Sequence, residues 1–251
     1  TAAQYALLLD LLAPIADRLL PLPGNHDEES LFRSTFADRL PQGVAEGHCS
    51  YVVDEHPVRL VGLDTSIPGH HNGLFGDAQE IWLDTVLGDR PDHPTLVFTH
   101  FPPFTTGITF MDISGLSGAT RLREVIDAHP QVRMLVAGHL HRPIQTTVGN
   151  TLVSVCPSTG NQLGLDLHPD RGSAVDEPPG YQLHRWDGER FVTHTGLLWE
   201  GQRMAFAVCT AHHLDLGGRL PGSSACDNVE IFQDGFRIPW LKLYDRGAPN
   251  E

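Results

Sequence analysis

Hydrophobic residues recur along most of the chain with two different spacings. Residues 2–12 carry apolar side chains at helical spacing, which predicts a helix there. Three more helices are predicted over residues 30–40, 77–87 and 120–128, and Asp77 is the predicted N-cap of the helix over residues 77–87. Short apolar runs bounded by turn residues predict strands over residues 19–22, 50–53, 58–63, 95–98, 132–136 and 151–155.

The order of these elements indicates the fold class. Strands that alternate with helices and are followed by several successive strands are typical of layered α/β proteins. Residues 1–195 are therefore predicted to form one α/β domain. From residue 196 onward Gly and Pro interrupt the chain without a clear period, so residues 196–251 are assigned to a C-terminal extension of open role.

Composition excludes several classes of protein. The 251 residues carry a formal net charge of -14, which argues against nucleic-acid coating and against electrostatic attachment to anionic lipid. No apolar run reaches the roughly 18 residues of a membrane-spanning helix. The four cysteines contain no CxxC pair, so a zinc ribbon or disulfide scaffold is not expected, and a reducing, cytoplasmic location is favoured.

The 15 histidines include several that directly follow apolar runs. The segments are Gly24-Asn25-His26-Asp27, Thr99-His100 and Gly138-His139-Leu140-His141. Loops at the carboxyl ends of strands are where open α/β sheets build their sites. On an extended loop, His139 and His141 would point to opposite sides and could serve two adjacent metals. Imidazole, amide and carboxylate groups suit Mn, Fe, Zn or Co rather than Ca or Mg alone.

These motifs, in this order, resemble the last three motifs of the calcineurin-like metallophosphoesterases. Agreement extends to residues 51–64, Trp82-Leu83, His100-Phe101-Pro102-Pro103, Met111-Asp112 and residues 155–167. The pattern is similar to the bacterial branch that contains class III cyclic-nucleotide phosphodiesterases and the related glycerophosphodiesterase. The resemblance covers about residues 2–195 and implies a four-layer α/β/β/α sandwich.

The resemblance implies a set of metal ligands. Asn25, His100 and His139 match the ligands of the second metal, and His141 matches a ligand of the first. The family's cofactors are two divalent or mixed-valence transition metals. Such a pair clamps the phosphoryl oxygens and converts a bridging water to hydroxide near neutral pH.

Two further residues match catalytic positions of the family. His26 matches the residue that contacts the reacting phosphoryl group and protonates the leaving alkoxide. Asp27 matches the residue that orients this histidine.

One departure from the family pattern limits what is expected of the chain. The family's two earlier motifs, Asp-x-His and Gly-Asp, are absent ahead of Gly24, and Asp166-Leu167-His168 is interpreted as a chance match. A strand–helix–strand unit takes roughly 30 residues, so the domain is expected to lack its first strands and to be N-terminally truncated. The first metal site would keep His141 alone, and weak metal binding with poor turnover is expected.

The predicted activity is metal-dependent hydrolysis of small phosphodiesters, with 3′,5′-cyclic nucleotides such as cAMP as the first choice of substrate. Three alternatives stay open: a glycerophosphodiesterase, a phosphomonoesterase on the same fold, and a catalytically impaired fragment that serves as a binding or assembly module. Exposed sheet edges would favour a homo-oligomer. The expected partner is otherwise the small phosphodiester substrate, without coating of nucleic acid and without attachment to a membrane.

Three other positions lie near the motifs in the family pattern. For Asp64, at the end of a predicted strand, a structural role is favoured. Solvent exposure is favoured for His70 and His71 in their glycine-rich loop, over contact with substrate at the rim of the site. Asn161 stands where the family often has a histidine.

Overall fold

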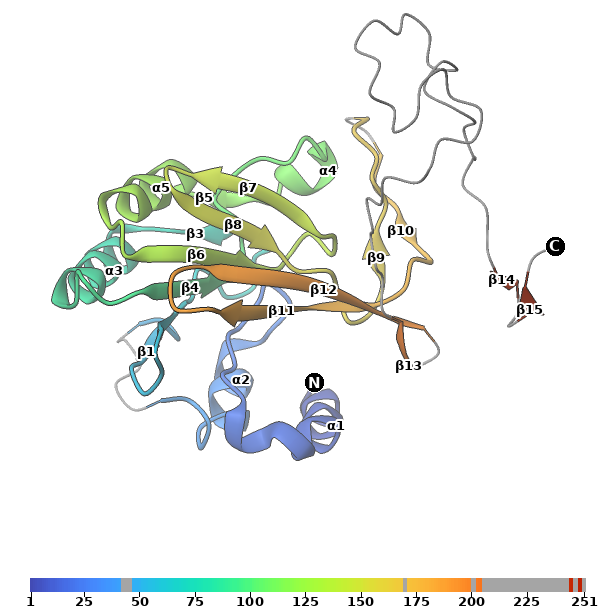
Figure 1. The fold of residues 1–251 in the computed structure, drawn as a ribbon. Coiled ribbons are helices and arrows are strands. Elements are labelled where there is room, and N and C mark those ends of the chain that lie inside the picture. Colours follow the sequence, from blue (N-terminus) through green and yellow to red (C-terminus); the bar gives the residue numbers. More distant parts are fainter. Residues whose placement is uncertain (42–46, 169–170, 200–201, 205–243, 246–247, 250–251) are drawn as a thin grey trace, which may run out of the picture. The chain divides into compact units, whose positions relative to one another are not determined.

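The computed structural model divides the chain into two units, Thr1–Ala205 and Phe206–Glu251. It describes residues 1–41, 47–168, 171–199, 202–204, 244–245 and 248–249 (Figure 1). In the second unit the described residues form an antiparallel pair of strands, β14 (Tyr244–Asp245) and β15 (Ala248–Pro249). The predicted boundary after residue 195 falls inside strand β12 (Phe191–Trp199) of the first unit. That boundary stays a prediction.

A six-stranded sheet forms the centre of the first unit. Its order is β1 (Tyr51–Val53), β2 (Arg59–Leu63), β4 (Thr95–Thr99), β6 (Val132–Ala137), β8 (Thr151–Val155) and β7 (Ile144–Val148). The four inner strands run parallel, whereas β1 and β7 pair antiparallel at the two edges. The carboxyl ends of the inner strands therefore lie along one edge of the sheet.

The four predicted helices are present, but the one predicted over residues 30–40 ends already at Thr35. They are α1 (Ala2–Leu12), α2 (Glu29–Thr35), α3 (Asp77–Asp89) and α5 (Ala119–Ala128). The structure also contains a 3-10 helix, η1 (Ala13–Arg18), directly after α1, and a single helical turn, α4 (Thr109–Asp112). Helix α1 begins with a capping box, in which the Thr1 hydroxyl accepts from the Gln4 amide and the Gln4 side-chain oxygen accepts from the Thr1 backbone nitrogen. The N-cap of α3 is Gly76 rather than Asp77.

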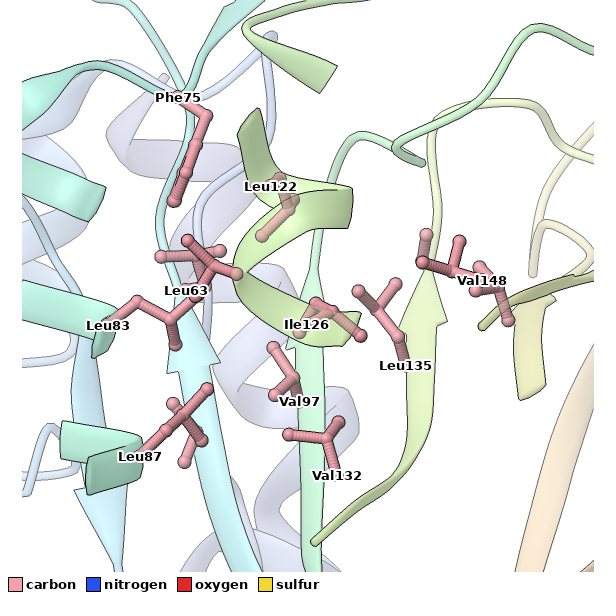
Figure 2. Packing of buried hydrophobic residues seen from close by; sticks show 14 of the residues in the cluster. Leu63, Phe75, Leu83, Leu87, Val97, Leu122, Ile126, Val132, Leu135 and Val148 are labelled. Atoms are coloured by element: carbon pink, nitrogen blue, oxygen red, sulfur yellow. The ribbon is translucent and has the colours of Figure 1, made fainter. Parts of the chain in front are cut away.

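The inner strands are apolar on both faces because both faces are covered. Helices α3 and α5 cover one face, where Leu83 and Leu87 of α3 and Ile126 of α5 pack with Val97 and Leu135 of the strands (Figure 2). All of these side chains are buried.

Alternate residues of the same strands point to the opposite face. There Leu96 and Met134 pack against Trp186 and Phe191 of a hairpin formed by β11 (Gly180–Trp186) and β12. This second sheet is completed by β13 (Gln202–Met204). The predicted α/β class is thereby confirmed, with helices, the central sheet and a second sheet in successive layers.

Short strand pairs complete the first unit. Strand β3 (Gly73–Leu74) runs parallel to β5 (Leu116–Ser117), and β9 (Gln162–Leu163) pairs antiparallel with β10 (Ala174–Val175). No helix in the described part of the chain is long and apolar enough to span a membrane.

The strand predicted over residues 19–22 is absent from the structure, and that prediction was wrong. Pro21 and Pro23 have no N–H to donate to a neighbouring strand. The segment is anchored instead by the buried Tyr51 hydroxyl, which donates to the Pro21 carbonyl at 2.8 Å. This contact brings the residues that follow, Gly24 onward, close to the central sheet.

Asp64 follows β2 and is buried. Its carboxylate accepts hydrogen bonds from the Cys49 amide at 2.8 Å and from the Ser66 amide and hydroxyl at 2.9 and 2.6 Å. The carboxylate thus joins the segment before β1 to the end of β2. These contacts support the structural role favoured from the sequence.

Candidate metal centre

Two of the predicted ligands follow neighbouring strands. His100 comes directly after β4, and Gly138-His139 comes directly after β6, which runs parallel to β4. The Gly138 amide donates to the His100 carbonyl at 3.0 Å, so the two turns are tied together. The imidazole rings of His100 and His139 lie with their centroids 5.2 Å apart. The sheet therefore brings these two side chains together as the sequence predicted.

Asn25 reaches the same place from a distant part of the chain. Its Oδ1 lies 2.8 Å from His100 Nε2. Two donor atoms that bind one cation at about 2.0–2.2 Å lie only about 3 Å apart, so this pair is spaced as joint ligands are. The preceding Gly24 packs flat against the His100 ring, where a Cβ atom would lie 2.8 Å from Cε1 and Nδ1.

His139 presents a buried nitrogen with no partner. The side chain is only 6% exposed, and its Nε2 has no hydrogen-bond partner in the described structure. A buried polar atom is normally satisfied, and an exception calls for a reason such as an ion. The rings of Phe101 and His100 pack beside it, with the Phe101 centroid 4.5 Å from that of His139.

The backbone around His139 is held in a rare conformation. His139 and His141 have φ values of 65° and 51°, in the left-handed region that few non-glycine residues adopt. Leu140 between them is buried in the main hydrophobic core, which fixes the turn. The extended loop assumed from the sequence was therefore wrong, whereas the assignment of His139 and His141 to two different metals stays a prediction.

His141 is oriented by a backbone carbonyl. Its Nδ1 lies 3.1 Å from the carbonyl oxygen of Asn161. A carbonyl can only accept, so Nδ1 carries the proton and Nε2 keeps its lone pair. A metal-ligating histidine commonly donates its other ring N–H in this way. The Asn161 position, where the family often has a histidine, thus contacts the centre through its backbone.

The environment keeps the central imidazoles neutral. Burial, followed by the nearby His139, His141 and His26, lowers the pKa of His100 to about 3. Burial and His141 lower the pKa of His139 to about 4, against a hydrogen bond to the Ser114 backbone that raises it. Neutral imidazole is the form that binds a metal, so both side chains are competent ligands near pH 7.

Asp27 holds the loop that carries Asn25 and His26. Its carboxylate accepts a hydrogen bond from the Gly24 amide at 2.8 Å and another from the hydroxyl of Tyr5 in α1. Burial and the bond to Asp27 raise the pKa of Tyr5, which keeps the hydroxyl protonated as a donor. The role of Asp27 in orienting His26 stays a prediction. No motif in the sequence pointed to Tyr5.

His26 is exposed and faces the loop before β3. Its ring packs edge to face against His71, with centroids 5.7 Å apart. His71 is exposed as expected, and it also lies beside a predicted catalytic residue.

The donor set fits one divalent cation better than two. Asn25, His100 and His139 offer an amide oxygen and two neutral imidazoles in one place. Among the described residues no group of three His, Cys, Asp or Glu is arranged to hold a metal, so the centre depends on the Asn25 amide. His141 is the one predicted ligand for a second cation.

Gly24→Ala should weaken binding of Mn²⁺ by about tenfold or more, because the added methyl displaces the His100 ring from Asn25. Titration calorimetry of the full chain measures the affinity. Gly88→Ala is the matched control, since Gly88 lies in α3 with nothing near its Cβ position. Equal Mn²⁺ affinity in the two variants would contradict the packing role of Gly24.

The chain is similar to a known protein family and to several known proteins. The Calcineurin-like phosphoesterase family model matches residues 2–143, and a Hydantoinase B/oxoprolinase model matches residues 189–251, which lie mostly outside the described residues. A probable glycerophosphodiester phosphodiesterase, GpdQ, from Arcobacter nitrofigilis is 33% identical over 79% of this chain and 73% of its own length. A probable cyclic nucleotide phosphodiesterase from Rhodopseudomonas palustris is 31% identical over 83% of this chain and 77% of its own.

Among solved structures, a dimetal phosphatase from Danio rerio aligns with 55% of this chain and 60% of its own, at 16% identity and a TM-score of 0.45. The family match spans more than half of the chain and includes Asn25, His100, His139 and His141. This protein belongs to the calcineurin-like phosphoesterase family and is a hydrolytic phosphoesterase.

Proposed function

We propose that this protein hydrolyses small phosphodiesters, with 3′,5′-cyclic nucleotides such as cAMP as the first candidates. The observation that carries the proposal is the buried, unpartnered His139 Nε2 beside the His100–Asn25 pair. The relative named as a cyclic nucleotide phosphodiesterase supports the choice of substrate. Glycerophosphodiesters are the second candidate, which the relative named GpdQ supports.

The proposed cofactors are divalent or mixed-valence transition metals chosen from Mn, Fe, Zn and Co. Asn25, His100 and His139 would hold one cation, and His141 would contribute to the other. When bound, such cations supply positive charge against the phosphoryl oxygens and lower the pKa of bound water. That local charge also offsets the repulsion between an anionic diester and a chain of net charge -14.

His26 is the proposed proton donor to the leaving alcohol. Its ring is exposed toward solvent and lies close enough to lower the pKa of His100 and His139 by its charge. The Asp27 hydrogen bonds to the Gly24 amide and the Tyr5 hydroxyl fix the loop that carries it. Proton transfer matters most when the departing alkoxide is a strong base.

We place the protein in the cytoplasm as part of the same proposal. Cys49 and Cys156 are both free thiols, and Cys49 is buried. Unpaired cysteines are typical of proteins from a reducing compartment.

The protein with Mn²⁺ should cleave bis-p-nitrophenyl phosphate faster than p-nitrophenyl phosphate, because the proposed reaction is diester hydrolysis. His139→Ala should lower the diester rate by about 100-fold or more, since it removes a metal ligand. His56→Ala, in the exposed β1–β2 turn, is the control and should keep the parent rate. Faster monoester cleavage would favour a phosphomonoesterase. Absence of Mn²⁺-dependent turnover would favour a binding or assembly module.

His26→Ala should slow hydrolysis of an alkyl diester more than that of bis-p-nitrophenyl phosphate, by a further factor of about ten or more. Nitrophenolate departs without a proton, whereas an alkoxide needs one. The kcat values on the two substrates measure the difference, with His70→Ala in the neighbouring exposed loop as the control. Equal losses on both substrates would contradict the acid role of His26.

A further inference from the structure

A cavity of about 390 Å³ is lined by several residues that directly follow, in the chain, residues in contact with the histidines of the candidate metal centre. Its volume is within the range of small-molecule binding sites. The walls combine apolar and polar side chains from the β3–β5 region and the first turns of α5. Those that carry the inference are Asn72, Pro102, Phe104, Leu116, Thr120 and Arg123.

Three wall residues each adjoin a residue that contacts a histidine of the centre. Asn72 follows His71, whose ring packs against His26. Pro102 follows Phe101, whose ring packs against His139 and His100. Chain connectivity therefore places the cavity wall within one residue of groups that touch His26 and His139.

The loop before β5 makes the same connection. Gly115 lines the cavity, and the backbone of the preceding Ser114 lies within reach of the His139 side chain. Gly115 is itself fixed, because its carbonyl accepts from the Gly73 amide at 3.2 Å. The segment that lines the cavity thus also approaches the candidate metal ligand His139.

Arg123 supplies a fixed cation to the wall. Its Nη1 donates to the Pro103 carbonyl at 2.6 Å, and its Nη2 donates to the Thr120 hydroxyl at 2.9 Å. These two bonds use only part of its five N–H groups. The guanidinium is therefore held in place next to Phe104 with donors to spare.

The acidic wall residue, Asp112, is hydrogen-bonded within its own loop. Both oxygens of the Asp112 carboxylate accept hydrogen bonds from the amides and hydroxyl of Thr106 and Gly107. The groups left to meet a ligand are a flat cation, an aromatic ring, an amide and hydroxyls.

We propose that this cavity binds the heterocyclic base of a nucleotide whose phosphoryl group lies at the candidate metal centre. The inference rests on the proposed phosphodiesterase function. A flat guanidinium and an aromatic ring are the surfaces on which bases stack, and the Asn72 amide offers both a donor and an acceptor to a base edge. A glycerol group would leave the apolar walls formed by Pro102, Phe104 and Leu116 uncovered.

Ala119→Leu tests the cavity by filling it, because Ala119 lines it at the start of α5. Adenosine should bind the full-length protein, and the substitution should weaken that binding by about tenfold or more, as loss of base stacking does. The affinity is measured by titrating adenosine with the protein in the absence of added metal and monitoring the adenosine signals by NMR. Ala128→Leu, at the exposed far end of the same helix, is the matched control and should bind adenosine like the parent.

Arg123→Met provides a second variant if Ala119→Leu fails to fold. It keeps the aliphatic stem, removes the donors and should weaken adenosine binding by about fivefold or more. Arg133→Met, on an exposed position of β6, is its control. Thermal melting of each variant confirms that the fold is intact.

Turnover gives an independent readout. Ala119→Leu should raise the KM for cAMP by about tenfold and leave the KM for glycerophosphoethanolamine unchanged. Equal adenosine binding by the parent, Ala119→Leu and Ala128→Leu proteins, or no binding by the parent, would overturn the proposal. If the proposed hydrolysis does not occur, the parent protein will show no turnover. The adenosine titration would then still test whether the cavity binds a base.

Discussion

The contact between the Gly24 backbone and the His100 ring holds the candidate metal centre together. His100 belongs to the central sheet, whereas Gly24 lies in a segment without regular structure. The ring fits against Gly24 because that residue has no Cβ. This close approach lets Asn25 Oδ1 reach His100 Nε2. The Tyr51–Pro21 and Tyr5–Asp27 hydrogen bonds act on either side of Gly24 and fix the same segment.

The turn after β6 imposes a second constraint. The left-handed backbone conformations of His139 and His141, on either side of Leu140, cost on the order of 1–3 kcal/mol each. Burial of Leu140 in the core offsets much of that cost, since a fully buried leucine contributes about 1.5–3 kcal/mol. The strained backbone turns one imidazole inward, where its Nε2 is buried, and leaves the other bonded to the Asn161 carbonyl.

The sequence predicted site residues correctly where a histidine directly follows an apolar run that forms a strand of the central sheet. The apolar runs before His100 and His139 predicted two strands, and the parallel pairing of β4 and β6 then brings the two histidines together. Strand β7 was missed because the polar residues of Ile144–Val148 suit an edge strand, with one exposed face, and give no apolar run. The apolar run at residues 19–22 led to a wrong strand prediction. Its side chains are apolar because the segment packs beside β1, and its backbone does not pair with a strand. Contacts such as Tyr5–Asp27 and the cavity at Arg123 join distant segments, so no local pattern encodes them.

The position of a bound metal tests the central claim most directly. Crystals of the full chain soaked in Mn²⁺ and measured near the manganese absorption edge would locate the ion by its anomalous scattering. We expect the strongest peak within about 2.0–2.4 Å of Asn25 Oδ1 and of ring nitrogens of His100 and His139. A strongest peak remote from these three side chains, or no peak at a concentration that supports turnover, would contradict the assignment of the centre.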